Sequence, residues 1–339
     1  MQPRLEINRI HHVSLIAKQP ERTARFYVDL LGLHRADEFH RDDSFAQNTI
    51  PLSDGKGTLI AVSGSPDGAA GESGIGTVHH IALAVDTVDA LLKWKGWLQS
   101  NDVLVYGPYD QQAYEDIIFV DPDGVLIEIA TRGPGWEATR DGEEVYVPPV
   151  KSMAPFRDEA EIRLRTWPHP VTRVEEDMSL QGFHHVSTIV SSLVETDRFY
   201  RDNLGMPLVR KMVDSDDPEV EQWYWGSQGG RPGSLITAFP IVHIHESGPL
   251  MVGQAGVGVA DHFALGANVD EQALRSWSFT AAGQGVSVET IPSHRHQSVA
   301  IHSPDRLTVE LVATLTERVN NTAAQVHDTR SLETRRGDQ

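Results

Sequence analysis

An internal repeat constrains the fold of this chain more than any other feature of its sequence. The segment HHVSLIAKQPERTARFYVDLLGL at 11–33 matches HHVSTIVSSLVETDRFYRDNLGM at 184–206 without a gap. The segments 80–130 and 262–312 match in the same way, with DPDG in one standing opposite SPDR in the other. Two gap-free matches at separate offsets indicate two kinds of module, each present twice in the chain.

The order of elements inside a module follows from hydrophobic periodicity. Each module begins with a short β-branched strand, and a helical stretch follows whose apolar residues share one face, as at Phe26, Tyr27 and Leu30. Three further short strands complete the module. The predicted fold class is therefore α+β, with four βαβββ modules in two paired-module half-barrel cups. The modules are expected at about 8–63, 76–132, 181–241 and 257–313.

The domain prediction follows the module limits. We expect a first two-module domain over 1–132, a proline-containing linker over 133–180, a second two-module domain over 181–315 and a tail over 316–339. The sequence leaves open which modules pair with one another. It also leaves the oligomeric state open, although exposed strand edges in such modules are compatible with a homodimer.

Composition excludes several classes of function. The chain has 29 Lys and Arg against 48 Asp and Glu, a net charge of −19, which argues against a nucleic-acid partner. It has no cysteine, so disulfides, zinc-thiolate sites and thiol nucleophiles are excluded. No apolar run is long enough to cross a membrane and the first residues do not resemble a signal peptide, so we expect no membrane association and a cytoplasmic location.

Adjacent histidines stand at the start of a predicted strand in three modules, at 11–12, 79–80 and 184–185. Side-chain alternation predicts that one histidine of each pair points into a cup and the other away from it. Glu128 lies in the apolar strand VLIEIA, where a carboxylate is costly unless it is paired or bound to a metal. Two imidazoles and one carboxylate form the facial triad that holds non-haem Fe(II).

The first and third modules carry Ala61 and Thr237 where the second and fourth carry Glu128 and Glu310. A cup built from one module of each kind therefore offers three protein ligands rather than four. Three ligands leave coordination positions for a substrate and O₂, which favours oxygen chemistry over a four-ligand isomerase site.

These residues resemble the vicinal oxygen chelate superfamily, which includes glyoxalases, bleomycin-resistance proteins and extradiol dioxygenases. Within it they resemble the hydroquinone-type ring-cleaving dioxygenases. GTVHHIALAV with DPDGVLIEIATRGPGW is similar to the last module of that family, and GFHHVSTIV with FYRDNLGMPLVRKMVDSDDP is similar to its first. The chain thus resembles a circular permutation of the family's module order.

The resemblance implies a site and a chemistry. It implies that His80, His185 and Glu128 hold Fe(II), or Mn(II) or another divalent metal, and that no organic cofactor is used. The neighbouring His184 is implied to act as an acid/base or substrate contact. The implied function is ring cleavage of a hydroquinone or catechol-like aromatic by O₂, although the ring substituents stay open. Alternatives on the same fold are a metal-dependent lyase or isomerase of the glyoxalase type and a metal-free small-molecule-binding protein.

Two departures from the family pattern concern the substrate. Ile118 stands where the family carries a tyrosine ten positions before the metal-binding glutamate, and Gln222 stands where it carries a histidine. Tyr114 and Ser187 are further candidates for the cup.

A second constellation repeats the triad elsewhere in the chain. His12, His262 and Glu310 could form the same group in the other cup, with His294 and His296 nearby in sequence. The sequence leaves open whether this group binds a metal.

Overall fold

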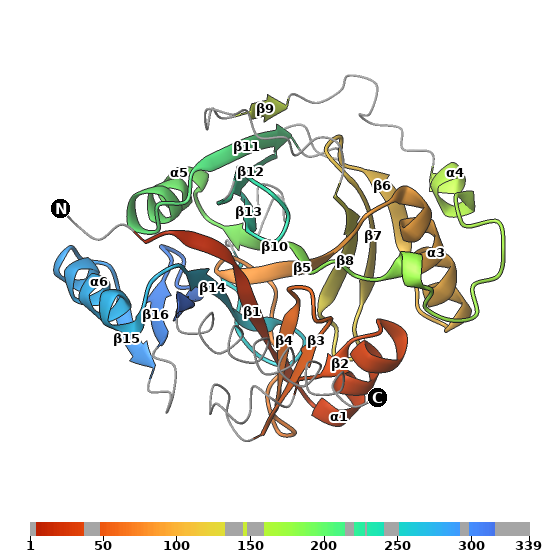
Figure 1. Ribbon diagram of the computed structural model, residues 1–339, viewed down its shortest axis with the longest axis horizontal. Coiled ribbons are helices and arrows are strands. Elements are labelled where there is room, and N and C mark those ends of the chain that lie inside the picture. The colour runs from red at the N-terminus through yellow and green to blue at the C-terminus, as the bar shows by residue number, and fades with distance from the viewer. Residues whose placement is uncertain are drawn as a thin grey trace, which may run out of the picture.

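The computed structural model describes residues 5–36, 48–132, 145–147, 159–213, 220–227, 229–240, 251–291 and 298–315. Two mixed β-sheets with helices packed around them make up this part of the chain (Figure 1). The predicted α+β class and the paired-module cups are confirmed. His294, His296 and the predicted tail at 316–339 lie outside the described residues.

The eight-stranded sheet combines the first and fourth modules, in the order β15-β16-β17-β14-β1-β4-β3-β2. Its strands are β1 Ile7–Ala17, β2 His34–Arg35, β3 Thr49–Ser53, β4 Leu59–Gly64, β14 Ala260–Ala267, β15 Val288–Ile291, β16 Ser298–His302 and β17 Thr308–Ala313.

The nine-stranded sheet combines the second and third modules, in the order β6-β7-β8-β5-β10-β13-β12-β11-β9. Its strands are β5 Thr77–Val85, β6 Tyr106–Asp110, β7 Glu115–Val120, β8 Leu126–Thr131, β9 Val145–Val147, β10 Phe183–Val190, β11 Leu208–Val213, β12 Glu221–Trp225 and β13 Leu235–Pro240. Of the pairings that the sequence left open, each sheet therefore joins one module from the first half of the chain with one from the second half. The limits of the predicted domains stay a prediction.

The helices each follow a module's first strand or lie in the linker. They are α1 Pro20–Arg25 with the π-helical turn η1 Phe26–Leu30, α3 Val88–Ser100, α4 Glu159–Leu164, the 3-10 turn η3 Glu176–Met178, α5 Leu193–Arg198 with the π-helical turn η4 Phe199–Asn203, and α6 Glu271–Gly283. Side-chain caps start three of them, for example Thr87, whose hydroxyl accepts a hydrogen bond from the Ala90 N–H. None of the helices among the described residues is long and apolar enough to span a bilayer.

The linker packs against α3 through polar contacts as well as apolar ones. Lys95 is 1% exposed, and its ammonium donates to the carbonyls of Ile162, Arg163 and Arg165 at the end of α4. The Trp94 indole donates to the Met178 carbonyl. These bonds satisfy carbonyls that a helix end leaves without partners.

One large apolar core joins the helices to one face of both sheets. Alternate residues of the central strands belong to it, for example Ile81 and Leu83 of β5 and Ile127 and Ile129 of β8. The residues between them therefore face the other side of the sheet. We call that inner face cup A in the nine-stranded sheet and cup B in the eight-stranded sheet.

Five register shifts interrupt the two central antiparallel pairs. In β10–β5 the register skips His184 and His79, and in β1–β14 it skips Asn8, His11 and Asp261. Apart from Asn8, each skipped residue comes directly before a histidine of the candidate triads. A bulge re-aims the side chain of the extra residue, so strict alternation does not hold at these four positions.

Candidate metal centre

The strand register places the three predicted ligands of cup A together. His185 on β10 lies opposite Ala82 on β5, and Ala82 lies opposite Glu128 on β8. His80 is two residues before Ala82, on the same face of the strand. The small side chain of Ala82 leaves the space between the three groups open.

The ligand atoms of this group converge. The His80 Nε2 lies 2.9 Å from the His185 Nε2 and 3.2 Å from the Glu128 Oε2. All three residues are buried, and His185 is fully so. The structure thus brings together the three residues that were predicted as ligands, while their binding of a metal stays a prediction.

Burial sets the protonation of the group. It lowers the pKa of His80 and His185 well below the usual value, helped by the neighbouring histidines. It raises the pKa of Glu128 well above the usual value, with Asp116 adding to the effect. Both imidazoles are therefore neutral at pH 7 and have lone pairs to offer a cation.

The donor set fits a divalent metal. Two neutral imidazoles and one carboxyl group meet, and the Glu128 Oε1 is buried without a hydrogen-bond partner among the described residues. A bound cation would remove the cost of burying this carboxylate. His/His/Glu with open positions suits iron and other first-row divalent ions.

The paired histidines differ from the prediction of one inward and one outward ring, which was wrong. The His184 Nδ1 lies 2.8 Å from the His185 Nδ1, and the His79 Nδ1 lies 2.9 Å from the His80 Nδ1. The bulges bring each preceding ring against the ring of the candidate ligand. One nitrogen of each contact must carry the proton, so these contacts select the tautomers of His185 and His80.

Two tyrosines form an aromatic wall beside the triad. The Tyr114 ring centroid is 4.8 Å from that of His184 and 5.8 Å from that of His185. The Tyr114 hydroxyl lies 3.3 Å from the Tyr224 hydroxyl, which donates to the Gln222 Oε1 at 2.8 Å. Tyr114 was a candidate in the sequence, whereas Tyr224 was missed. Alternation in EQWYW, which puts Tyr224 on the face of Gln222, was the available signal.

Other candidates also face cup A. Ile118 on β7 lies directly opposite Glu128, and the Ser187 hydroxyl is buried without a hydrogen-bond partner among the described residues. Asp116, which the sequence reasoning missed, is fully buried on the face of Ile118 and acts on the pKa of Glu128. The apolar side chain of Ile118 thus lies opposite the Glu128 carboxylate, and the hydroxyl groups of cup A come from outside β7.

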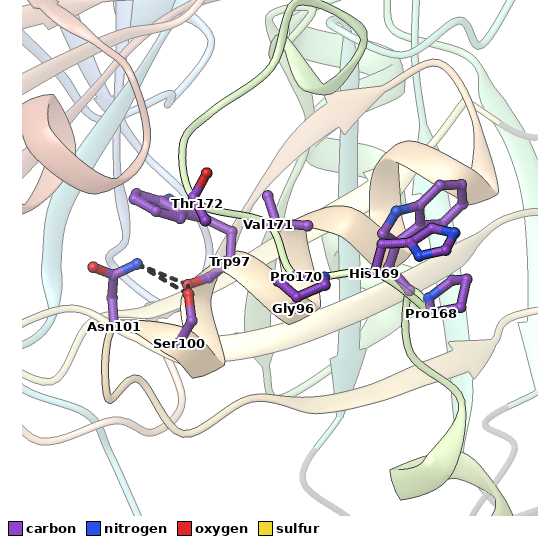
Figure 2. A pocket seen from close by; sticks show the side chains of 10 residues that line it. Gly96, Trp97, Ser100, Asn101, Pro168, His169, Pro170, Val171 and Thr172 are labelled. Atoms are coloured by element: carbon purple, nitrogen blue, oxygen red, sulfur yellow. Dashed lines mark hydrogen bonds between the residues drawn. The ribbon is translucent and has the colours of Figure 1, made fainter.

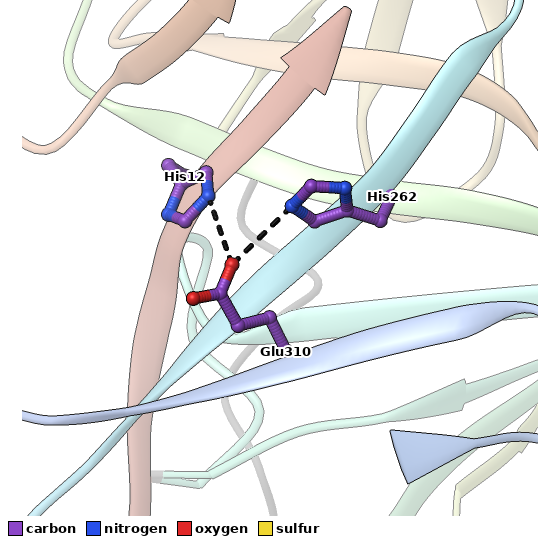
Figure 3. A group of neighbouring side chains, drawn as sticks. All are labelled: His12, His262 and Glu310. Atoms are coloured by element: carbon purple, nitrogen blue, oxygen red, sulfur yellow. Dashed lines mark ion pairs between the residues drawn. The ribbon is translucent and has the colours of Figure 1, made fainter. Parts of the chain in front are cut away.

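The second constellation also comes together, in cup B (Figure 3). The His12 Nε2 and the His262 Nε2 each lie 3.3 Å from the Glu310 Oε2. Burial lowers the pKa of His12 to about 4. Burial also opposes the charge of His262, but hydrogen bonds with Asp261 and Glu310 outweigh it and raise its pKa to about 9.

A hollow of about 590 Å³ lies away from both cups, between α3 and residues 167–172 (Figure 2). The polar side chains at the end of α3 form hydrogen bonds within that helix end. Ser100 and Asn101 both donate to the Trp97 carbonyl. The chemistry of the described residues therefore points to the cups rather than to this hollow.

Paired βαβββ modules with a His/His/Glu group on the inner face of the sheet define a protein with the vicinal oxygen chelate fold. Residues 9–129 match the family model of the Glyoxalase/Bleomycin resistance protein/Dioxygenase superfamily. Over these residues the chain is similar to that superfamily, and the resemblance predicted from the sequence is confirmed at the level of the superfamily.

Relatives match over part of the chain. "Putative ring-cleaving dioxygenase MhqO" of Bacillus subtilis (strain 168) is 31% identical over 131 residues, 39% of this chain and 39% of the relative. MhqE of the same strain, with the same description, is 35% identical over 112 residues, 33% of this chain and 34% of the relative. The aligned part of the chain thus spans little more than a third of each relative.

Solved structures share the fold over most of the chain. A dioxygenase from Bacillus subtilis subsp. subtilis str. 168, described as putative, superposes with a TM-score of 0.64 at 21% identity, covering 91% of this chain and 86% of that one. Glyoxalase I from Zea mays superposes with a TM-score of 0.59 at 15% identity, covering 92% and 94%. At these identities the comparison establishes the fold alone.

Proposed function

We propose that the protein is an Fe(II)-dependent, extradiol-type ring-cleaving dioxygenase that acts on a hydroquinone or catechol-like aromatic. The observation that carries the proposal is the buried group of His80, Glu128 and His185 beside the tyrosine wall of cup A. The descriptions of MhqO and MhqE support the same chemistry.

The metal would be held by these three side chains. When bound, Fe(II) would supply a Lewis acid for a phenol oxygen and electrons for O₂. The protein's contribution is to leave coordination positions open, because the positions equivalent to Glu128 in the partner module are Thr237 in cup A and Ala61 in cup B. Both reactants could then meet at one centre.

The tyrosine wall orients an aromatic ring and its oxygen atoms. Burial raises the pKa of Tyr114 and Tyr224 well above the usual value. Tyr224 adds to the rise in the pKa of Tyr114, whereas the hydrogen bond with Tyr114 opposes the rise in the pKa of Tyr224. Their hydroxyls therefore keep their protons. A substrate that replaced the Gln222 contact would receive the Tyr224 proton as a hydrogen bond to an anionic phenol oxygen. The ring faces of Tyr114 and Tyr224 offer contact area to an aromatic substrate.

For His184 we propose mainly a positioning role. Its ring is fully buried, its Nδ1 contacts the Nδ1 of His185, and burial lowers its pKa to about 3. A group with this pKa holds a proton poorly at pH 7. The predicted acid/base role is therefore less well supported than the positioning of His185, and the predicted substrate contact stays a prediction.

The test is metal analysis of anaerobically purified protein, with oxygen uptake on hydroquinone and on catechol. We expect near-stoichiometric iron in cup A that His80→Ala removes together with oxygen uptake. His34→Ala, on the exposed strand β2, is the matched control and should change neither. A redox-inactive metal without oxygen uptake would indicate a glyoxalase-type lyase or isomerase. Ligand binding with no metal requirement would indicate a binding protein, and either result overturns the proposal.

A further inference from the structure

Cup B repeats the geometry of cup A strand by strand. His12 on β1 lies opposite Ala264 on β14, and Ala264 lies opposite Glu310 on β17. His262 is two residues before Ala264. The three candidate ligand groups therefore occupy the same register positions as His185, Glu128 and His80 do around Ala82.

The side chains of cup B converge on one carboxylate oxygen. Both imidazole Nε2 atoms lie 3.3 Å from the Glu310 Oε2, and the ring centroids of His12 and His262 are 5.7 Å apart (Figure 3). The three ligand atoms lie within 4.8 Å of one another. Each ring comes from a different central strand, so the sheet fixes the arrangement.

Asp261 gives this group a feature that cup A lacks. It fills the bulge position that His79, His184 and His11 fill elsewhere, and its Oδ2 accepts a hydrogen bond from the His262 Nδ1 at 2.8 Å. A carboxylate can only accept here, which fixes the proton on Nδ1 and directs Nε2 toward Glu310. Carboxylate–histidine contacts of this kind support metal-binding histidines and raise their basicity.

The surroundings of the two groups differ in size. Ala300 lies opposite Glu310 where Ile118 lies opposite Glu128, and Pro51 pairs with Ala61 where Tyr224 pairs with Thr237. The side chains of His262 and Glu310 are 19% and 12% exposed, against 9% and 3% for His80 and Glu128. Cup B thus has the same donor atoms as cup A, but the side chains around them are smaller and the donor groups are more exposed to solvent.

We propose that His12, His262 and Glu310 form a second site for a divalent first-row transition metal, with Asp261 orienting His262. The site lies outside the proposed dioxygenase centre and does not depend on that function. Water from the more open side would complete the coordination of the ion. Since Tyr224 has no aromatic counterpart at Pro51, the second site would not hold an aromatic ring in the way proposed for cup A.

The test counts metal ions in the full chain after removal of bound metal and addition of Co(II) or Mn(II). Isothermal titration and elemental analysis would be applied to the wild type, Glu310→Gln, Glu128→Gln and the double variant. We expect two ions in the wild type, one in each single variant and none in the double variant. Glu128→Gln is the matched control, because it changes the equivalent residue of cup A.

The two single variants distinguish this proposal from the dioxygenase proposal. An ion lost with Glu310→Gln supports the second site even if Glu128→Gln has no effect. A single ion that only Glu128→Gln removes overturns it and leaves cup A intact. Asp261→Asn guards against a folding failure. It should weaken binding in cup B by roughly 10- to 100-fold relative to the wild type without affecting cup A. An unchanged affinity of cup B in this variant would contradict the role of Asp261.

Discussion

At the scale of single residues, Tyr224 shows how this chain supplies a hydroxyl group to cup A. Its hydroxyl contacts Tyr114 and Gln222, while Ile118 opposite Glu128 offers no hydrogen bond. We expect Tyr224→Phe to lower kcat/KM on a hydroquinone by roughly 10- to 100-fold, because a hydrogen bond to a charged group is worth about 1.5–3 kcal/mol. Steady-state oxygen uptake measures this.

The metal content should be unchanged in Tyr224→Phe, since the hydroxyl is not among the candidate ligands. Tyr106→Phe, at a tyrosine that is 52% exposed, is the control for losing a phenol elsewhere. Full activity in Tyr224→Phe would show that the tyrosine wall supplies only apolar contact.

Asp121 is a second buried residue with a defined consequence. Its Oδ1 accepts hydrogen bonds from the N–H groups of Asp123, Gly124 and Val125, and its Oδ2 accepts one from the Tyr27 hydroxyl. Burial raises the pKa of Asp121 from its ordinary 3.8 to about 6, although the backbone donors oppose this.

The folded state therefore binds more protons at Asp121 than the unfolded state between about pH 4 and pH 6. The stability from this group is complete below its unfolded pKa and is lost as the pH rises through the folded value. About two pKa units correspond to about 3 kcal/mol. Asp121→Asn keeps an acceptor oxygen and cannot ionise. Relative to the wild type, its free energy of unfolding should rise by about that amount from pH 3.5 to pH 7 in urea titrations, and a constant difference would contradict this.

At the scale of elements, the turn before β14 depends on a close backbone approach. Gly258, before β14, has φ +86°, and a Cβ there would lie 2.4 Å from the Asp123 carbonyl oxygen. Gly258→Ala should lower the free energy of unfolding by roughly 3 kcal/mol, from backbone strain plus overpacking.

Gly124→Ala is the matched control, because Gly124 has φ +106° but no atom within 4 Å of the added Cβ. It should cost about 1 kcal/mol from strain alone. Equal losses in the two variants, measured by denaturant titration, would show that the contact with Asp123 relaxes without cost.

The elements also show what the sequence could predict. The repeat and the 2.0 and 3.6 periods were enough to predict the modules. The choice of His80, His185 and Glu128 as candidate ligands came from the resemblance to the superfamily. The bulges were not predictable, because an extra residue is defined only against the partner strand, and the partner was unknown. For the same reason alternation misplaced His79 and His184. Module pairing stayed open because apolar faces such as that of Ile81 and Leu83 suit either partner.

At the scale of the whole molecule, turns from each sheet hold a module of the other. The Asp123 carboxylate accepts hydrogen bonds from the Lys18 N–H and the Thr23 hydroxyl of the first module. The Asp305 carboxylate accepts two from Ser191 of the third module. Asp123 of the second module thus bonds to the first module in the other sheet, and Asp305 of the fourth module bonds to the third. Backbone bridges between residues 70–75 and 252–257 add to these contacts. We infer that the two sheets unfold together.

Metal binding in one cup should therefore stabilise both sheets. In Glu310→Gln, which leaves only cup A intact, metal at roughly a hundred times its Kd should add about 2.7 kcal/mol to the free energy of unfolding. Hydrogen exchange of the slowest amides should report this gain in β1 and β14 as well as in β5 and β10, because such amides exchange through global opening. Combining Asp123→Ala with Asp305→Ala should reduce the gain in β1 and β14, whereas Asp67→Ala, at an exposed aspartate, should not. If metal increased the protection of β5 and β10 alone while Asp123 and Asp305 were intact, the two sheets would open independently. The two cups would then be energetically separate.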